Sequence, residues 1–179
     1  MELLTGKAAA ARLAGMLHAK YQVHRHSVDL TIKNVYSLDP KGQVDFGGGE
    51  YVAAGRVVVE GARRRPEENH PWWTLVRGPY FIEYNEALDL TEDEVGVLEP
   101  SDRLMRAGAS HPTIFLRGRV PRIEILLDVH AQKVEFMQNA RISRLRLFRM
   151  ANADLLPAAK PASRKKRKPT KHPESEPQT

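Results

Sequence analysis

The chain has 179 residues, of which 41% are apolar and 28% charged, with a net charge of +6 at pH 7. That length suits one domain of ordinary size with a short appendage. The chain has no cysteine, which excludes disulfides, thiolate catalysis and cysteine-based zinc sites. No apolar run approaches the roughly 20 residues of a membrane span, and the first residues lack a secretory pattern. We therefore expect a cytoplasmic protein without membrane contact.

A predicted helix and strand open the chain. Thr5 can cap a helix over residues 6–20, whose alanine-rich run favours helix and aligns its larger apolar residues on one face. Residues 27–32 alternate apolar and polar side chains, which is typical of a half-buried strand. Three basic residues at positions 24–26 precede Asp29 on this strand. They are either part of a metal or acid–base cluster, or the solvated entry to a strand.

The next part of the chain reads as a hairpin, a loop and a strand. Three glycines at 47–49 lack the Lys-Ser/Thr and the helix of a phosphate-binding loop, so we interpret them as a flexible hairpin turn. Residues 52–59 are strand-like, and residues 61–71 form a polar, proline-bounded surface loop. Trp72 and Trp73 begin a strand with one ring expected inward and one outward. The outward ring is a candidate oligomer contact.

Two strand-like runs, residues 80–84 and 122–129, frame one short helix. Ser101 can cap that helix, and Gly108 can end it in the left-handed conformation, so we predict helix over residues 101–107.

Two further strands are predicted at residues 133–137 and 141–149. The second of them is arginine-rich on one face. Those arginines either bind phosphates or form a solvated face that pairs with Glu124, Asp128 or Glu135.

The positive charge is concentrated at the C-terminal end. Residues 157–179 hold seven basic and two acidic residues, a charge of +5, which leaves +1 for the rest of the chain. Prolines recur there and apolar residues are scarce, so we expect a disordered basic tail after a domain of residues 1–156. The basic cluster at 164–168 predicts a weak, salt-dependent contact with nucleic acid. A solubilising tail without a specific partner is the alternative.

Several segments, in this order along roughly residues 1–149, resemble the deoxyuridine triphosphatase and deoxycytidine triphosphate deaminase superfamily, in particular its smaller archaeal-type members. After a leading helix they are Ser-Val-Asp-Leu-Thr at 27–31, Gly-Pro-Tyr at 78–80 with Tyr-Asn-Glu at 84–86, the helix segment at 100–109, and Ala-Arg-Ile-Ser-Arg-Leu at 140–145. The resemblance implies an all-β domain, a distorted jelly roll or β-barrel with a short N-terminal helix. It also implies a homotrimer with sites between subunits.

The resemblance further implies roles for single residues. Arg106 matches the second arginine of the family motif Pro-Arg-Ser-Ser-x-x-Arg-x-Gly and, with Arg103, is expected to bind phosphate. Asp29 stands at a metal-shell position for Mg²⁺. Asp128, in Leu-Leu-Asp-Val-His-Ala, lies near the catalytic glutamate of the deaminase branch, and we expect it to direct and deprotonate water.

The chain departs from the family in its catalytic motifs. Ser101, Asp102 and Arg103 replace Arg-Ser-Ser, Arg117 stands about where a motif aspartate belongs, and Arg144 replaces a late glutamine. Two functions therefore stay open. One is an enzyme on deoxypyrimidine triphosphates, of the dUTP diphosphatase or dCTP deaminase type. The other is a catalytically inactive member that binds nucleotides or nucleic acid in regulation.

Overall fold

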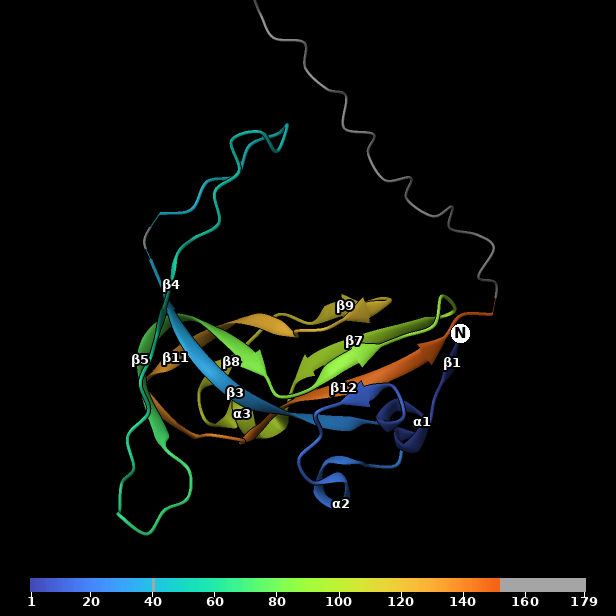
Figure 1. Cartoon of the computed structure of the whole chain (residues 1–179), viewed down its shortest axis with the longest axis horizontal. Helices are drawn as coiled ribbons and strands as arrows, with labels where there is room; N and C mark the ends of the chain where they lie inside the picture. The colour runs from blue at the N-terminus through green and yellow to red at the C-terminus, as the bar shows by residue number, and fades with distance from the viewer. Residues whose placement is uncertain (40, 152–179) are drawn as a thin grey trace, which may run out of the picture.

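A computed structural model describes residues 1–39 and 41–151 of the chain (Figure 1). The predicted basic tail at 157–179 and the domain boundary at residue 156 lie outside the described residues. No helix among the described residues is long and apolar enough to cross a membrane.

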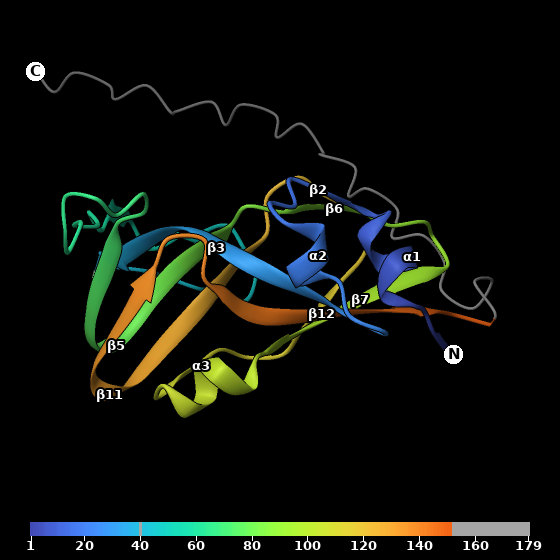
Figure 2. The same ribbon diagram turned by 90° about the horizontal axis from the view of Figure 1, so that it is seen from below.

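The fold is built on an antiparallel sheet that curls on itself, as expected for an all-β domain of the jelly-roll or barrel kind (Figures 1 and 2). Along its main path the strands are β8 (Ala109–Ser110), β11 (Glu124–Met137), β5 (Trp72–Tyr84), β3 (Val28–Leu38), β12 (Arg141–Arg149), β7 (Glu94–Pro100) and β9 (Ile114–Leu116). Short strands β1 (Glu2–Leu3) and β4 (Arg56–Val58) pair with β12 and β3. A separate three-stranded sheet consists of β10 (Arg119–Val120), β6 (Ala87–Asp89) and β2 (Leu13–Ala14).

The core forms where the long strands turn their alternate apolar side chains inward. On β3, Val28, Leu30 and Ile32 are fully buried, and Leu145 and Leu147 of the neighbouring β12 are buried with them. Burial of such side chains supplies the main favourable free energy of folding. The predicted strands at 27–32, 80–84 and 141–149 are confirmed, and those at 122–129 and 133–137 are one strand, β11, with an irregularity between Val129 and Lys133.

The N-terminal helix is shorter than the predicted 6–20. Thr5 caps α1 (Gly6–Ala10) as expected, accepting from the Ala8 amide at 3.2 Å. The chain then leaves the helix because residues 13–14 pair with β6, and Gly15 adopts a φ of 81° at a place where an added β-carbon would lie 2.4 Å from the Asn85 carbonyl oxygen. Tertiary pairing here overrides local helix propensity, and α2 (Ala19–Gln22) follows as a separate turn.

The short helix at the centre of the chain forms as predicted. Ser101 accepts a hydrogen bond from the Leu104 amide at 3.2 Å and caps α3 (Asp102–Arg106). Gly108 has a φ of 89°, and an added β-carbon would lie 2.6 Å from that of Ala131. A glycine is required at this position, since both the conformation and the space exclude a side chain.

The two tryptophans also divide as predicted. Trp73 is buried in the core, whereas Trp72 is half-buried and lies under the guanidinium of Arg64, whose central carbon is 3.7 Å from the ring centroid. The strand expected at 52–59 is shorter than predicted, because only residues 56–58 pair continuously with β3.

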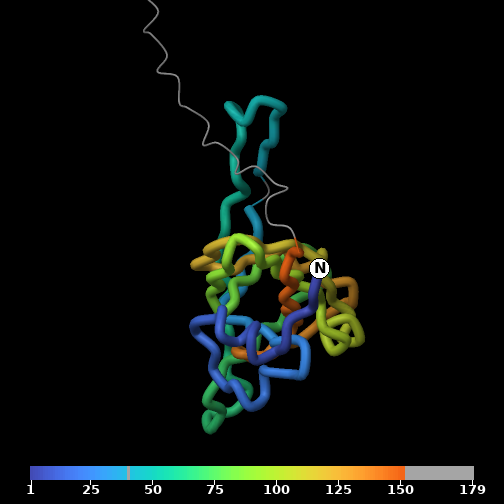
Figure 3. The backbone as a smooth tube through the Cα atoms, turned by 90° about the vertical axis from the view of Figure 1, so that its right-hand side faces the viewer, coloured from blue at the N-terminus to red at the C-terminus, as the bar shows by residue number. Residues whose placement is uncertain are grey.

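A hairpin, here called the arm (residues 41–55), leaves the barrel between β3 and β4. Figures 1 and 3 show it extending well beyond the rest of the fold. Gln43 and Val52 exchange two backbone hydrogen bonds of 2.9 and 2.8 Å, and the predicted glycine turn at 47–49 lies at its end.

Candidate functional site

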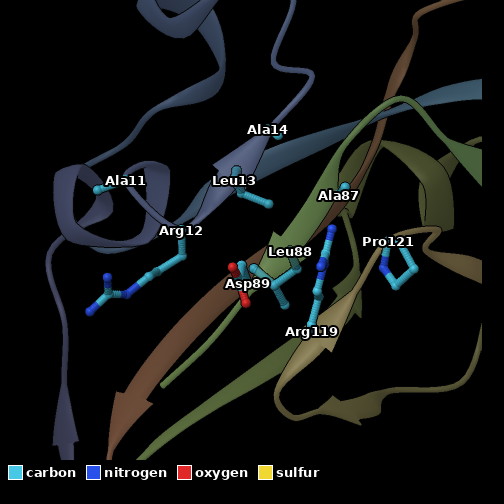
Figure 4. Close-up of a pocket in the computed structure, with 9 residues that line it drawn as sticks. All are labelled: Ala11, Arg12, Leu13, Ala14, Ala87, Leu88, Asp89, Arg119 and Pro121. Carbon is cyan, nitrogen blue, oxygen red and sulfur yellow. The ribbon is translucent and has the colours of Figure 1, made fainter. Parts of the chain in front are cut away.

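Among the hollowed parts of the surface, two regions differ in the charge that they offer. The first, here called the Arg119 hollow, lies between β2, β6 and β10 and has Leu13, Leu88 and Pro121 among its lining side chains (Figure 4). Two arginines line this hollow, Arg119 and Arg12. Arg12 is already engaged, because it turns to Glu94 and donates two hydrogen bonds of 2.8 and 3.0 Å. These bonds lower the pKa of Glu94. Apart from Arg119 and Asp89, whose charges are opposite, the remaining lining of this hollow is therefore mainly apolar.

The second hollowed region follows the turn between β11 and β12, and we call it the hairpin groove. It consists of two hollows that share Met137, Asn139 and Arg141. The His18 hollow holds about 520 Å³ and is lined further by Leu17, His18, Tyr21, Gln22, Thr31 and His70. The Arg103 hollow holds about 400 Å³ and brings in Arg103, Leu104 and Trp72. The groove combines guanidinium groups with aromatic surface, and that combination suits a nucleotide.

The floor of the His18 hollow is a satisfied network of buried polar groups. Gln22 is 1% exposed, and its side-chain oxygen accepts from the amides of Leu17 and His18 at 3.0 and 2.8 Å. Its amide nitrogen donates to Glu86 at 2.7 Å, and Thr31 donates to the same carboxyl through its backbone and its hydroxyl at 2.9 and 2.7 Å. Burial raises the pKa of Glu86 despite these donors. The network fixes the segment before α2 onto β3.

Asp29 lies beside the groove in a cluster of basic groups. Its carboxylate is 2.9 Å from His24 Nε2, 3.7 Å from Arg141 Nη1 and 3.5 Å from Arg144 Nε. Arg141 also donates to the Tyr21 carbonyl. The structure thus makes Asp29 the anchor of the arginine that both hollows share.

The arginine face of β12 pairs with other acids than those expected. Arg146 pairs with Glu99, and Arg149 lies 3.3 Å from Asp93. The predicted partners of this face were Glu124, Asp128 and Glu135. Their strand, β11, is separated from β12 in the sheet by two strands, β5 and β3, and among the described residues Glu124 and Glu135 pair with other cations.

The two predicted phosphate ligands lie on α3, one helical turn apart. Arg103 lines the groove, and Arg106 is exposed on the same helix. Residues three apart on a helix lie about 5–6 Å from each other. Within the described residues neither arginine has an acidic partner within 4 Å. Both guanidinium groups therefore remain available for an anion.

Asp128 lies far along the sheet from Asp29. It is half-buried on β11, opposite Pro79 of β5 and Ser110 of β8. Tyr80 of β5 pairs with Ser37 of β3, so Pro79, the partner of Asp128, is level with Leu38 at the end of β3. Leu38 is nine residues beyond Asp29 on the same strand, which is about 30 Å at roughly 3.3 Å per residue. One chain therefore does not bring the predicted base and the predicted metal ligand into one site.

The residues around Asp29 do not fit a resident Mg²⁺. The Oδ1 atom of Asp29 has no hydrogen-bond partner, but a guanidinium nitrogen faces it and two further basic groups flank the carboxylate. The described part of the chain holds no cluster of three histidine or acidic side chains. Magnesium usually takes one or two carboxylates together with substrate phosphates and waters, and Asp29 would be the single protein ligand here.

A buried relay of three side chains was not predicted from the sequence. His111 donates from Nδ1 to the Pro112 carbonyl at 2.9 Å and accepts from Ser143 at 2.7 Å, and Tyr84 contacts the same hydroxyl at 2.5 Å. Burial lowers the pKa of His111. Ser143 and its partners are at most 5% exposed, so this arrangement holds strands together and does not reach a substrate.

Comparison with known proteins adds sequence relatives and a shared fold. No family model matches the chain. The chain is 28% identical over 136 residues to the "Probable deoxyuridine 5'-triphosphate nucleotidohydrolase" of Methanosarcina acetivorans, covering 75% of each chain. It is 28% identical over 137 residues to the protein of the same name from Archaeoglobus fulgidus, covering 73% of this chain and 74% of that one. Among solved structures, the 2'-deoxycytidine 5'-triphosphate deaminase from Agrobacterium tumefaciens aligns with a TM-score of 0.60 at 14% identity, over 82% of this chain and 47% of that chain.

Proposed function

We propose that this chain, which belongs to the deoxyuridine triphosphatase and deoxycytidine triphosphate deaminase superfamily, hydrolyses deoxyuridine triphosphate in the hairpin groove. The two sequence relatives are named as probable enzymes of that activity, and this chain covers about three quarters of the length of each. The likeness to the deaminase supports the fold alone. Uracil is therefore the better-supported base, and the reaction would release pyrophosphate.

The observation that carries this proposal is the pair of arginines on the two walls of the groove. Arg103 comes from α3 and Arg141 from β12, and both line the same hollow. A guanidinium binds phosphate oxygens through two parallel hydrogen bonds. Arg106 extends the positive charge along α3 by one turn, which suits a chain of phosphates.

The other half of the groove suits the nucleoside. Tyr21 and His18 lie edge to face with ring centroids 6.1 Å apart, and both line the His18 hollow. Base–aromatic contacts stabilise a bound base by roughly 1–3 kcal/mol. The side chains of Gln22 and Thr31 are held by the buried network, so they form a rigid wall for the ligand.

The distance between Asp29 and Asp128 supports a site that is shared between copies of the chain. We propose a homotrimer in which Asp128 of one copy serves as the base at the groove of another. A general base must come within hydrogen-bond reach of its water, and Asp128 cannot do so at its own copy's groove.

The proposal is tested by incubating the full-length protein with deoxyuridine triphosphate or deoxycytidine triphosphate, with and without magnesium. Release of pyrophosphate from the uracil nucleotide, with no ammonia from the cytosine nucleotide, is the expected result. Ammonia release would assign the deaminase reaction instead. Binding of deoxyuridine triphosphate without turnover would assign the chain to the catalytically inactive alternative.

A further inference from the structure

The arm carries an apolar tip that is exposed to solvent. Phe46 is fully exposed, and Val44, Tyr51 and Val52 beside it are exposed as well. An exposed cluster of large apolar side chains marks an interaction surface. No core residue comes from the arm, so its apolar side chains do not serve the folding of the barrel.

The hairpin groove offers a surface of matching chemistry. Leu17, Tyr21 and Met137 are large apolar side chains that remain exposed, and all three line the His18 hollow. The arm bears Asp45 and Glu50 next to its apolar tip. The hollow is bordered by His18, His70 and Arg141, and Lys20 lies 5.8 Å from the Tyr21 ring centroid. The tip is thus apolar and acidic, and the hollow is apolar and basic.

The arm cannot reach the groove of its own chain. In Figures 1 and 3 it rises from one side of the barrel, whereas the loop of residues 61–71, which leads to His70 of the groove, lies on the opposite side. The complementary surfaces of one chain therefore face away from each other. Two patches that match but cannot meet within one molecule make a heterologous contact, which gives a ring where the rotation between copies closes and an open filament where it does not.

We propose that the arm of one copy docks into the His18 hollow of a second copy, with Phe46 inserted between Leu17, Tyr21 and Met137. Asp45 and Glu50 then lie near the basic border of the hollow. The neighbouring arm then occupies the part of the groove proposed for the nucleoside and leaves the Arg103 hollow open, so arm docking and nucleotide binding compete for the His18 hollow. The contact needs no nucleotide, so it can be tested independently of the proposed hydrolysis.

The chain has no cysteine, so single cysteines can map the contact without background. A chain with Phe46→Cys is mixed under mild oxidation with a differently tagged chain that carries Leu17→Cys. We expect a disulfide between the two chains, since docking brings these positions within the short Cα–Cα distance that a disulfide allows. The control replaces Leu17→Cys by Phe115→Cys, an apolar position on β9 that is more exposed than Leu17, and should give no such product.

The strength of the contact is measured by the concentration dependence of the mass from light scattering. Phe46→Asp should weaken association by roughly 10- to 100-fold, the factor that corresponds to one buried aromatic side chain. Phe115→Asp should leave association unchanged. The proposal is overturned if the Leu17 pair gives no more disulfide than the Phe115 pair, or if Phe46→Asp associates like the unmodified chain.

Discussion

Asp29 and Arg144 lie directly opposite each other on β3 and β12, yet their facing atoms, Oδ1 and Nε, are 3.5 Å apart and neither has a hydrogen-bond partner. The pair is an electrostatic contact without a hydrogen bond. The carboxylate offsets the charges of Arg144 and Arg141 and also lies 2.9 Å from His24 Nε2. Its first role in the fold is therefore to hold three basic groups at the edge of the hairpin groove.

Asp29→Asn should lower the free energy of unfolding by about 1–3 kcal/mol, because it keeps the shape and leaves partly buried arginines without their counter-charge. Urea unfolding at neutral pH measures the change. The matched control is Asp39→Asn, an exposed acidic residue between β3 and the arm. A loss for Asp29→Asn no larger than that of the control would contradict this role.

Glu83 should make the stability of the protein dependent on pH. Burial would raise the pKa of Glu83, but hydrogen bonds from Asn34, Lys33 and Tyr36 outweigh it and hold the pKa at about 2. A lowered carboxyl pKa contributes stability above the ordinary glutamate range, and this contribution is lost as the pH falls toward 2. It amounts to about 3 kcal/mol at neutral pH.

Glu83→Gln should therefore be less stable than the unmodified protein at pH 7, and the difference should shrink between about pH 5 and pH 2. Denaturant unfolding at a series of pH values gives both curves. A gap that stays constant over this range would show that the charge of Glu83 does not stabilise the fold.

Gly108→Ala should lower stability by about 1–3 kcal/mol, since its φ of 89° and the nearby β-carbon of Ala131 leave no room for a side chain. Thermal unfolding measures the effect. Gly49→Ala in the arm is the control, because its φ is not positive and nothing lies within 4 Å of an added β-carbon. Equal melting temperatures for the two variants would be the contrary result.

Some of these features were predictable from the sequence, and others were not. The cap at Ser101 and the glycine at 108 are local signals, so the sequence predicts α3 with correct ends. The 6–20 helix was predicted too long, because the pairing of residues 13–14 with β6 is a tertiary contact that propensity does not contain.

The hairpin groove was not predictable because its walls are distant in sequence. It joins the segment before α2 with His70, Arg103 and the turn between β11 and β12. Only their neighbourhood in the curled sheet makes them one site. The resemblance singled out Arg106 and Asp29, and Arg103 was a candidate phosphate ligand beside Arg106, but Arg141 had no predicted role beyond a general phosphate or surface function.

Asp128→Asn should lower the rate of deoxyuridine triphosphate hydrolysis by a factor of about 10² to 10⁴, the usual loss for a missing general base. Its stability should stay unchanged, since the carboxylate has no ion-pair partner within the described residues. Turnover and urea unfolding are measured on the same preparation. Full activity in this variant would remove Asp128 from the reaction.

The assignment of the site to the hairpin groove is tested most directly by comparing two arginine variants for deoxyuridine triphosphate binding. Arg103→Ala removes a guanidinium from the groove, and Arg119→Ala removes one from the hollow in Figure 4. Isothermal titration should show at least about a tenfold loss of affinity for Arg103→Ala, as for a charged hydrogen bond of about 1.5–3 kcal/mol, and no loss for Arg119→Ala. The reverse pattern would place the nucleotide in the Arg119 hollow and contradict the assignment.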